Sequence, residues 1–342
     1  MNPFKNLLRV VPVLLIISAA VWAQEISVAD KLAEALKLYG ETQFDSGIAV
    51  VNECLKQPNL ASKDSIAAYE VLSIINYAKG EEFLKIAVGY LDKISKIGPC
   101  VIPLPHEIWP QELRDTWYRI LKAKESLSCT KEGESGLKTI AIMEFDNFSV
   151  GKYQEQLGFL SKGLADFFEH DFGKISALKV VERDKIDFVL KELELQKSGA
   201  VDQATAVKVG KILGAQIMIF GSITQLDDNN TRMIVRAVKV ETSEIIASVD
   251  KQGKPEYSKM EKELVGELAK QLDIQVSDQT KSLLIEGGTE SLDATTVYSK
   301  GLDYMDKYDY KNAYECFKKA YGLDKTFAEA KRKMEIYRPL AG

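Results

Sequence analysis

The residues of this chain that could do chemistry are few, and their spacing does not form a catalytic set. Glu169, His170 and Asp171 are adjacent in the sequence, but adjacent residues of a helix point apart, so these three are better explained as the charged end of a helix. The chain has only two histidines, which leaves little for a Ser-His-Asp arrangement. We therefore expect no catalytic residue and no enzyme activity, and a hydrolase that uses carboxylates alone is the alternative.

Metal and cofactor sites are not expected either. The four cysteines, Cys54, Cys100, Cys129 and Cys316, form no C-x-x-C pair, which makes a zinc site improbable. The glycines match neither the G-x-x-x-x-G-K-[ST] nor the G-x-G-x-x-G phosphate-binding pattern. Cys100 and Cys129 bracket one aromatic segment and are the pair to test for a disulfide, and four buried, unbonded cysteines are the alternative.

Candidate interface residues lie in three places. Glu182 and Arg183 end a strand-like run, where they either form an ion pair between elements or contact another molecule of an assembly. Trp117 belongs to the apolar stripe of an amphipathic segment, residues 111–127, which either caps the helices before it or docks a partner. Tyr298 and Tyr304 follow helical spacing near the C-terminus.

Four residues are assigned local structural roles. Asp184 and Asp202 precede helical patterns, where a carboxylate can accept hydrogen bonds from free backbone amides. Gly214 suits the left-handed position that ends a helix. Gly210 would let the same helix approach a sheet closely.

The elements that must position these residues form an α/β domain at residues 137–275. Apolar strand-like runs alternate with helical patterns of similar length, which is typical of one α/β layer structure. Two β-rich runs, Arg232–Val240 and Glu244–Val249, predict an antiparallel hairpin at its end. Arg232, Ile234 and Arg236 share one face of that hairpin, which suits water better than lipid.

Helical patterns flank this domain at residues 24–130 and 294–342. Helix pairs that recur about every 34 residues are typical of tetratricopeptide (TPR) repeats. In the last pair, Gly301 and Ala313 fall where two antiparallel helices touch, and Phe317 fills the space beside them. A lone pair cannot bury its apolar face, so we expect it to stack on the N-terminal pairs or on another copy of the chain.

The N-terminus predicts the compartment. Lys5 and Arg9 precede the apolar run Val10–Val21, and Val21-Trp-Ala23 supplies the small residues of a cleavage site. Residues 1–23 therefore read as a secretory signal peptide, and an uncleaved anchor is the alternative. We expect a periplasmic protein, either free or associated with the outer membrane. A net charge of −5 offers no basic face for nucleic acid.

The middle of the chain resembles the CsgG family, the curli-secretion component and its relatives. The resemblance rests on Glu182-Arg183 at a strand end, the run Lys185–Glu192, Gly210-Lys-Ile-Leu-Gly-Ala215, Phe220-Gly-Ser-Ile223 and the turn Val240–Ile245, in that order. It implies a CsgG-like α/β sandwich, and a role in envelope assembly or curli-type secretion through contacts with other envelope proteins.

The chain departs from pore-forming members of this family in one respect. Its turn Asp227–Asn230 and its segment Lys251–Pro255 are short, whereas each membrane strand needs about 9–11 residues. We therefore expect an adaptor without a transmembrane barrel of its own and with peripheral or no membrane contact. The alternative is one subunit of a homo-oligomeric ring that supports a separate outer-membrane channel.

Overall fold

The computed structural model describes residues 27–98, 108–127, 138–193, 202–285 and 288–342. The predicted signal peptide and the cysteine pair Cys100 and Cys129 lie outside these ranges, so both stay predictions. In the described residues Cys54 and Cys316 are free thiols.

One mixed sheet forms the centre of the fold. Its strands are β1 (Lys138–Ile142), β2 (Asp146–Asn147), β3 (Leu178–Val181), β4 (Ile217–Asp227), β5 (Asn230–Lys239) and β6 (Ile245–Gly253). Their order is β3-β1-β4-β5-β6, and β2 pairs with β4 beyond the end of β1. The pairs among β1, β2, β3 and β4 are parallel, whereas β4, β5 and β6 are antiparallel. The predicted α/β class and hairpin are confirmed.

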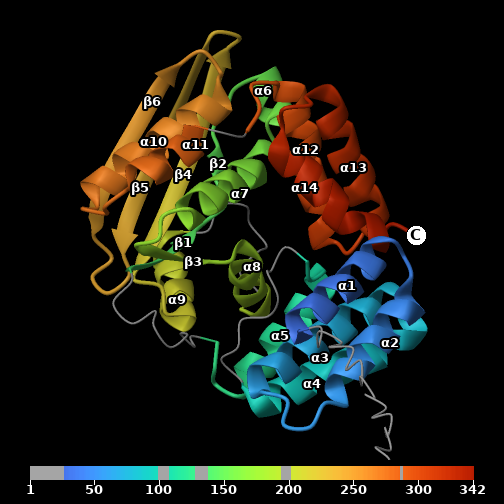
Figure 1. Ribbon diagram of the computed structural model, residues 1–342. Helices are drawn as coiled ribbons and strands as arrows, with labels where there is room; N and C mark the ends of the chain where they lie inside the picture. Colours follow the sequence, from blue (N-terminus) through green and yellow to red (C-terminus); the bar gives the residue numbers. More distant parts are fainter. Residues whose placement is uncertain (1–26, 99–107, 128–137, 194–201, 286–287) are drawn as a thin grey trace, which may run out of the picture.

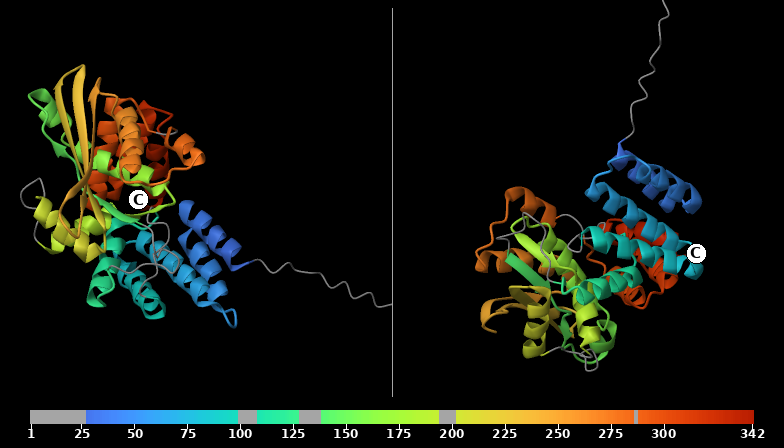
Figure 2. Two further views of the ribbon diagram at one scale, coloured as in Figure 1. Left: turned by 90° about the vertical axis from the view of Figure 1, so that its left-hand side faces the viewer. Right: turned by 90° about the horizontal axis from the view of Figure 1, so that it is seen from below.

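Helices cover both faces of this sheet (Figures 1 and 2). The short α6 (Lys152–Gln156) precedes α7 (Leu160–Gly173), which lies on one face with α10 (Tyr257–Gln271) and is followed in space by α11 (Asp278–Ile285). The opposite face is covered by α8 (Arg183–Glu192) and α9 (Gln203–Leu213) at one end of the strands. The rest of that face is in contact with solvent, since Arg232 and Arg236 of β5 are exposed there. The sequence predicts this, because these two arginines share one strand face with Ile234.

Two helical arms complete the molecule. The N-terminal arm contains α1 (Val28–Gly40), α2 (Phe44–Leu55), α3 (Ser62–Ala78), the turn η1 (Glu81–Phe83), α4 (Leu84–Ile97) and α5 (Gln111–Ala123). The C-terminal arm contains α12 (Leu292–Asp306), α13 (Tyr310–Leu323), α14 (Ala328–Tyr337) and the turn η2 (Arg338–Leu340). Both arms are helical, as predicted.

The predicted contact within the C-terminal arm is present. A Cβ on Gly301 would lie 2.7 Å from the Phe317 ring, so only glycine lets α12 and α13 approach this closely. The arm also touches the N-terminal arm, because the Tyr310 hydroxyl accepts a hydrogen bond from the Glu112 amide at 3.2 Å. Its larger contact is with α7, where the rings of Tyr298 and Phe167 stack 5.5 Å apart.

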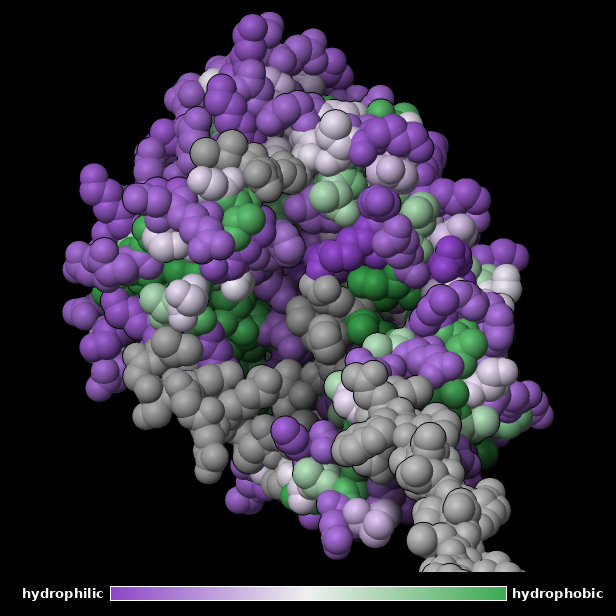
Figure 3. Space-filling model, in the orientation of Figure 1, coloured by the Kyte–Doolittle hydropathy of each residue, from purple (hydrophilic) through white to green (hydrophobic). Residues whose placement is uncertain are grey.

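The surface seen in Figure 3 is mainly hydrophilic over α10 and the C-terminal arm. Hydrophobic residues gather below α10 in the same view. In the part of the chain that the structure describes, we find no helix both long and apolar enough to span a bilayer.

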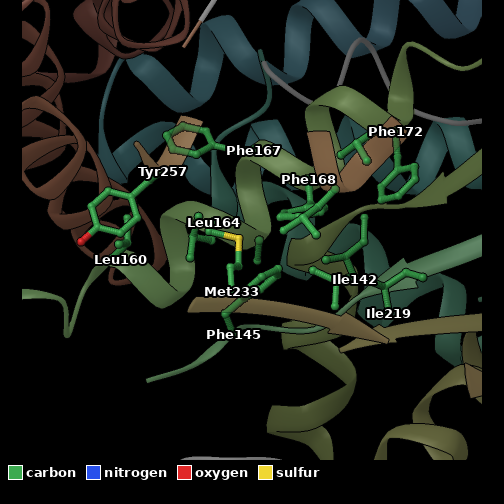
Figure 4. Close-up of a cluster of buried hydrophobic side chains, with 14 of the residues drawn as sticks. Ile142, Phe145, Leu160, Leu164, Phe167, Phe168, Phe172, Ile219, Met233 and Tyr257 are labelled. Atoms are coloured by element: carbon green, nitrogen blue, oxygen red, sulfur yellow. The ribbon is translucent and has the colours of Figure 1, made fainter. Parts of the chain in front are cut away.

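Alternation along the strands divides the core into two halves. Ile140, Ile142, Ile217 and Ile219 point toward α7, α10 and the C-terminal arm (Figure 4). The intervening residues of the same strands, such as Met218, point toward α8, α9 and the N-terminal arm. Each arm is therefore continuous with the core on one face of the sheet.

Three of the four local assignments are confirmed. The Asp202 carboxylate accepts from the Thr205 amide at 2.9 Å, and Gly214 is left-handed with φ 70°. A Cβ on Gly210 would lie 2.9 Å from Met218. The assignment of Asp184 as a helix cap is wrong: its carboxylate contacts Arg114 at 2.6 Å instead, and the Glu169 carboxylate accepts the Arg183 amide at 3.0 Å where α8 begins.

Candidate functional site

The strand order places a crevice at the end of β1. The chain leaves β1 through α7 on one face, reaches β3, and returns to β4 through α8 and α9 on the other face. In open α/β sheets, ligands bind outside the carboxyl ends of the strands where the direction of winding reverses. This chain has a groove of about 710 Å³ at that point, a size typical of binding pockets.

One wall of the groove comes from one continuous segment of the chain. Seven consecutive residues, Ile142 to Phe148, line it, from the end of β1 through β2. The opposite wall comes from α8, through Ile186 and Leu190, and from the end of α12, through Asp303 and Asp306. The C-terminal arm therefore supplies part of the candidate site.

Aromatic side chains give the groove an apolar side. Phe148 is 60% exposed and lines the groove together with Phe145 and Phe220. The Phe145 ring lies where a Cβ on Gly221 would be, so this glycine of β4 lets the ring pack against the sheet. Together these rings give the groove the apolar lining that is common in ligand pockets.

The floor of the groove is a buried ion cluster around Arg183, which is 4% exposed. Its guanidinium donates to Asp306 at 2.9 and 3.0 Å and to Asp187 at 2.9 Å. Lys162 donates at 2.6 Å to Asp306 Oδ2, an oxygen that also accepts from Arg183. A guanidinium that is fixed on several carboxylates is held rigidly.

Charge within this cluster is unevenly shared. Burial acts to raise the pKa of Asp306, but Arg183 and Lys162 outweigh it and hold that pKa below its ordinary value. Burial raises the pKa of Asp187 to about 7. Arg183 acts to lower this pKa, but the negative charge of Asp306 opposes that effect. The cluster thus favours the ionised form of Asp306 more strongly than that of Asp187.

The same cluster connects the arms to the sheet. Arg114 of α5 pairs with Asp184 of α8 at 2.6 Å, and Asp306 of α12 holds Arg183. Around it, the Tyr298 hydroxyl donates to Asp166 at 2.6 Å. Side chains from both arms and from the α/β layer therefore meet at one buried point.

Three of the five predicted interface residues are buried within this chain, and the other two are half-buried. Trp117 is 1% exposed and Tyr298 0%, and Arg183 is buried in the cluster above. Of the two alternatives for Arg183, an ion pair between elements or a contact with another molecule, the structure shows an ion pair. The partners of Arg183 are aspartates and not Glu182. Glu182 is half-buried and accepts from the Tyr118 hydroxyl at 2.6 Å, and Tyr304 is half-buried on α12.

Glu169, His170 and Asp171 diverge, as expected for neighbours on a helix. Glu169 accepts the Arg183 amide, His170 lies 3.8 Å from Glu329, and Asp171 pairs with Lys174 at 2.6 Å and Lys262 at 3.0 Å. The sequence did not predict that these three side chains are withdrawn from solvent. Burial raises the pKa of Glu169 to about 8 and lowers the pKa of His170.

Sequence reasoning missed the groove itself. Its residues lie on α7, α8, α12 and three strands, and the winding reversal at β1 exists only once the strand order is known. A signal was available in the run that follows β1, where Phe145 and Phe148 flank two polar residues at a strand's carboxyl end.

A second hollow of about 710 Å³ lies at the opposite ends of the strands. Ile217, Val240 and Leu272 line it, with Lys138 and Lys211 beside them. It opens at the amino ends of the parallel strands, where the winding reversal gives no crevice. The groove at the carboxyl ends is therefore the stronger candidate.

A mixed α/β domain with its groove at the strand reversal is the class that this geometry defines. Residues 122–235 match the family described as curli production assembly/transport component CsgG. The chain therefore contains a CsgG-family domain over that segment, which runs from α5 into β5 and includes most of the groove.

Two solved structures are similar over part of the chain. The LpoB C-terminal domain from Salmonella enterica is 12% identical, covering 42% of this chain and 96% of its own, with a TM-score of 0.28. The LpoB C-terminal domain from Escherichia coli is 16% identical, covering 39% and 93%, with a TM-score of 0.27. No curated protein matches the chain.

Proposed function

We propose that this protein is a non-enzymatic adaptor of the cell envelope that binds other envelope proteins through the groove beside β2. The observation that carries the proposal is the position of the groove: it lies at the strand reversal, inside the CsgG-family segment, and Phe148 stands exposed on its wall. The charged floor of the groove is occupied by ion pairs within the chain.

The finer parts of the function belong to the same proposal. We infer that residues 1–23 export the chain to the periplasm, that it acts there in envelope biogenesis or curli-type secretion, and that its helical arms are TPR repeats. The domain limits 24–130, 137–275 and 294–342 are part of this proposal.

Site-specific photo-crosslinking in the native host tests the adaptor role. A photoreactive phenylalanine analogue in place of Phe148 should crosslink to one or a few envelope proteins. The matched control is the same analogue in place of Leu323, which is 49% exposed at the end of α13 and does not line the groove. Equal crosslinking from both positions, or none from Phe148, would contradict the proposal.

An oligomeric ring that supports an export channel is the second candidate. It is favoured by the first residues of β6, the outer strand of the sheet, where Ile245 is 51% and Ile246 41% exposed. Exposed apolar residues on an edge strand promote pairing between chains. Size-exclusion chromatography with light scattering should then give a multiple of the chain mass, reduced by Ile246→Glu. A monomer in both cases would eliminate the ring.

A further inference from the structure

The groove has the form of a slot for one more β-strand. β3 pairs with β1 only as far as Val181 opposite Ala141, whereas the chain after β1 continues along β4 as β2. The side of β2 away from β4 therefore has no neighbouring strand among the described residues. The groove occupies that place, between the backbone of residues 142–148 and the helices α8 and α12.

Hydrogen-bond directions along β2 support this arrangement. The Phe148 amide donates to the Ile223 carbonyl at 2.8 Å, and the Val150 amide donates to the Gln225 carbonyl at 3.2 Å. Successive residues of a strand direct their backbone groups to opposite sides. The backbone N–H and C=O of Asn147, between these two residues, are therefore directed away from β4 and toward the groove that Asn147 lines.

We propose that the groove binds an extended segment of a partner protein, which adds to the sheet as a strand beside β2. The proposal rests on the adaptor function and specifies how that function recognises its partner. A groove between a strand edge and a helix is the geometry with which several peptide-binding domains add a strand: backbone hydrogen bonds give affinity, and pockets for alternate side chains give specificity. Of the seven residues that line this wall, β2 supplies the two with strand pairing, Asp146 and Asn147.

The side-chain environment defines the kind of segment. Alternate residues of an added strand would face Phe148, Phe220 and Leu190, which favour a large apolar side chain. The ion cluster below already pairs Arg183 with Asp306, so the floor offers little net charge to a ligand. The expected occupant is an uncharged or weakly charged extended segment with apolar residues at every second position, and not a folded helix or an anion.

A random nonapeptide library displayed on phage is the probe for the full chain. Selection on the wild type, with depletion on Phe148→Asp, should enrich peptides with apolar residues at alternate positions. The best peptide is then synthesised with one backbone N-methyl group at each position in turn. We expect at least a tenfold loss of affinity at every second position of the bound core and less than a threefold loss at the positions between.

Paired variants of the protein test the same edge. Asn147→Ala and Asn147→Pro both lose the side-chain hydrogen bonds to the Gln154 carbonyl (3.1 Å) and from the Ser149 amide (3.0 Å), but only proline also removes the backbone N–H that faces the groove. Asn147→Pro should bind the peptide at least tenfold more weakly than Asn147→Ala. Thermal melts check that both fold, and if the proline variant does not, the N-methyl series on the wild type decides alone.

Several outcomes would overturn strand addition: no peptide that depends on Phe148, an N-methyl profile without period two, or equal affinities of two folded Asn147 variants. These outcomes are separable from failure of the adaptor role. Crosslinking from Phe148 together with a flat N-methyl profile would keep the adaptor and eliminate the added strand, whereas absence of crosslinking would eliminate the adaptor.

Discussion

Replacement of Arg183 by methionine is expected to destabilise the protein far more than loss of one ion pair on the surface. Arg183 is buried and holds Asp306 and Asp187 at 2.9 Å. Methionine has a similar length but no charge, so Asp306 loses its main counter-charge while staying in a site of low polarity. Removal of one partner of a buried pair typically costs about 3–5 kcal/mol.

A matched control exists on the same molecule. Arg232 pairs with Asp250 at 3.0 Å, nearly the same distance, but both side chains are about half exposed. Exposed pairs contribute about 0–1 kcal/mol. Arg232→Met should therefore change the free energy of unfolding by less than about 1 kcal/mol, and comparison of the two variants isolates the effect of burial.

Urea unfolding followed by circular dichroism and by tryptophan fluorescence measures both variants. A double-mutant cycle with Asp306→Leu adds a second criterion. Because the two residues contact each other, the double variant should be more stable than the sum of the single losses predicts. If Arg183→Met cost less than about 1 kcal/mol, or no more than Arg232→Met, the buried cluster would not be what holds the arms to the sheet.

Three further predictions concern the core, the pH dependence and the C-terminal arm. Gly221→Ala should destabilise by about 1–3 kcal/mol, because its methyl group would overlap the Phe145 ring, whereas Gly253→Ala, which meets open space, should not, as urea unfolding can show. Burial raises the pKa of Glu169 from 4.5 to about 8, so folding takes up a proton between pH 4.5 and about 8, and the stability of the fold falls as the pH rises through this range. The thermal midpoint should therefore fall less between about pH 5 and 8 in Glu169→Gln than in the wild type. Deletion of Thr295–Gly342 should lower the midpoint, because it removes Tyr298 from the ring of Phe167 on α7, and an unchanged midpoint would contradict this packing.

Predictions from the sequence were correct where a residue contacts neighbours that are close to it along the chain. The cap at Asp202, the left-handed Gly214 and the helix contact at Gly301 each depend on residues within one or two turns or one helix pair. The same local rule failed at Asp184. A carboxylate one residue into a helix can cap it, but Arg114 lies 70 positions away in sequence and provides a stronger, buried partner.

The groove could not be predicted for a related reason. A two-residue strand such as β2 has no periodicity to detect, and its place beside β4 follows from the interruption at Phe145, whose ring packs over Gly221. The partner of Arg183 on α12 is separated from it by 123 residues. Sequence reasoning left open whether Arg183 pairs between elements or contacts another molecule, and only the fold shows that Asp306 of the C-terminal arm is its partner.

The two halves of the core give the arms a role in binding as well as in stability. Because α12 completes the core on α7 and also ends at Asp306, the helix that buries Tyr298 is the one that forms a wall of the groove. Asp306 is held by Arg183 and Lys162, which come from α8 and α7. The width of the groove is therefore fixed by the same ion cluster that docks the arm, so a change that loosens the cluster should weaken partner binding even when every residue that faces the partner is intact.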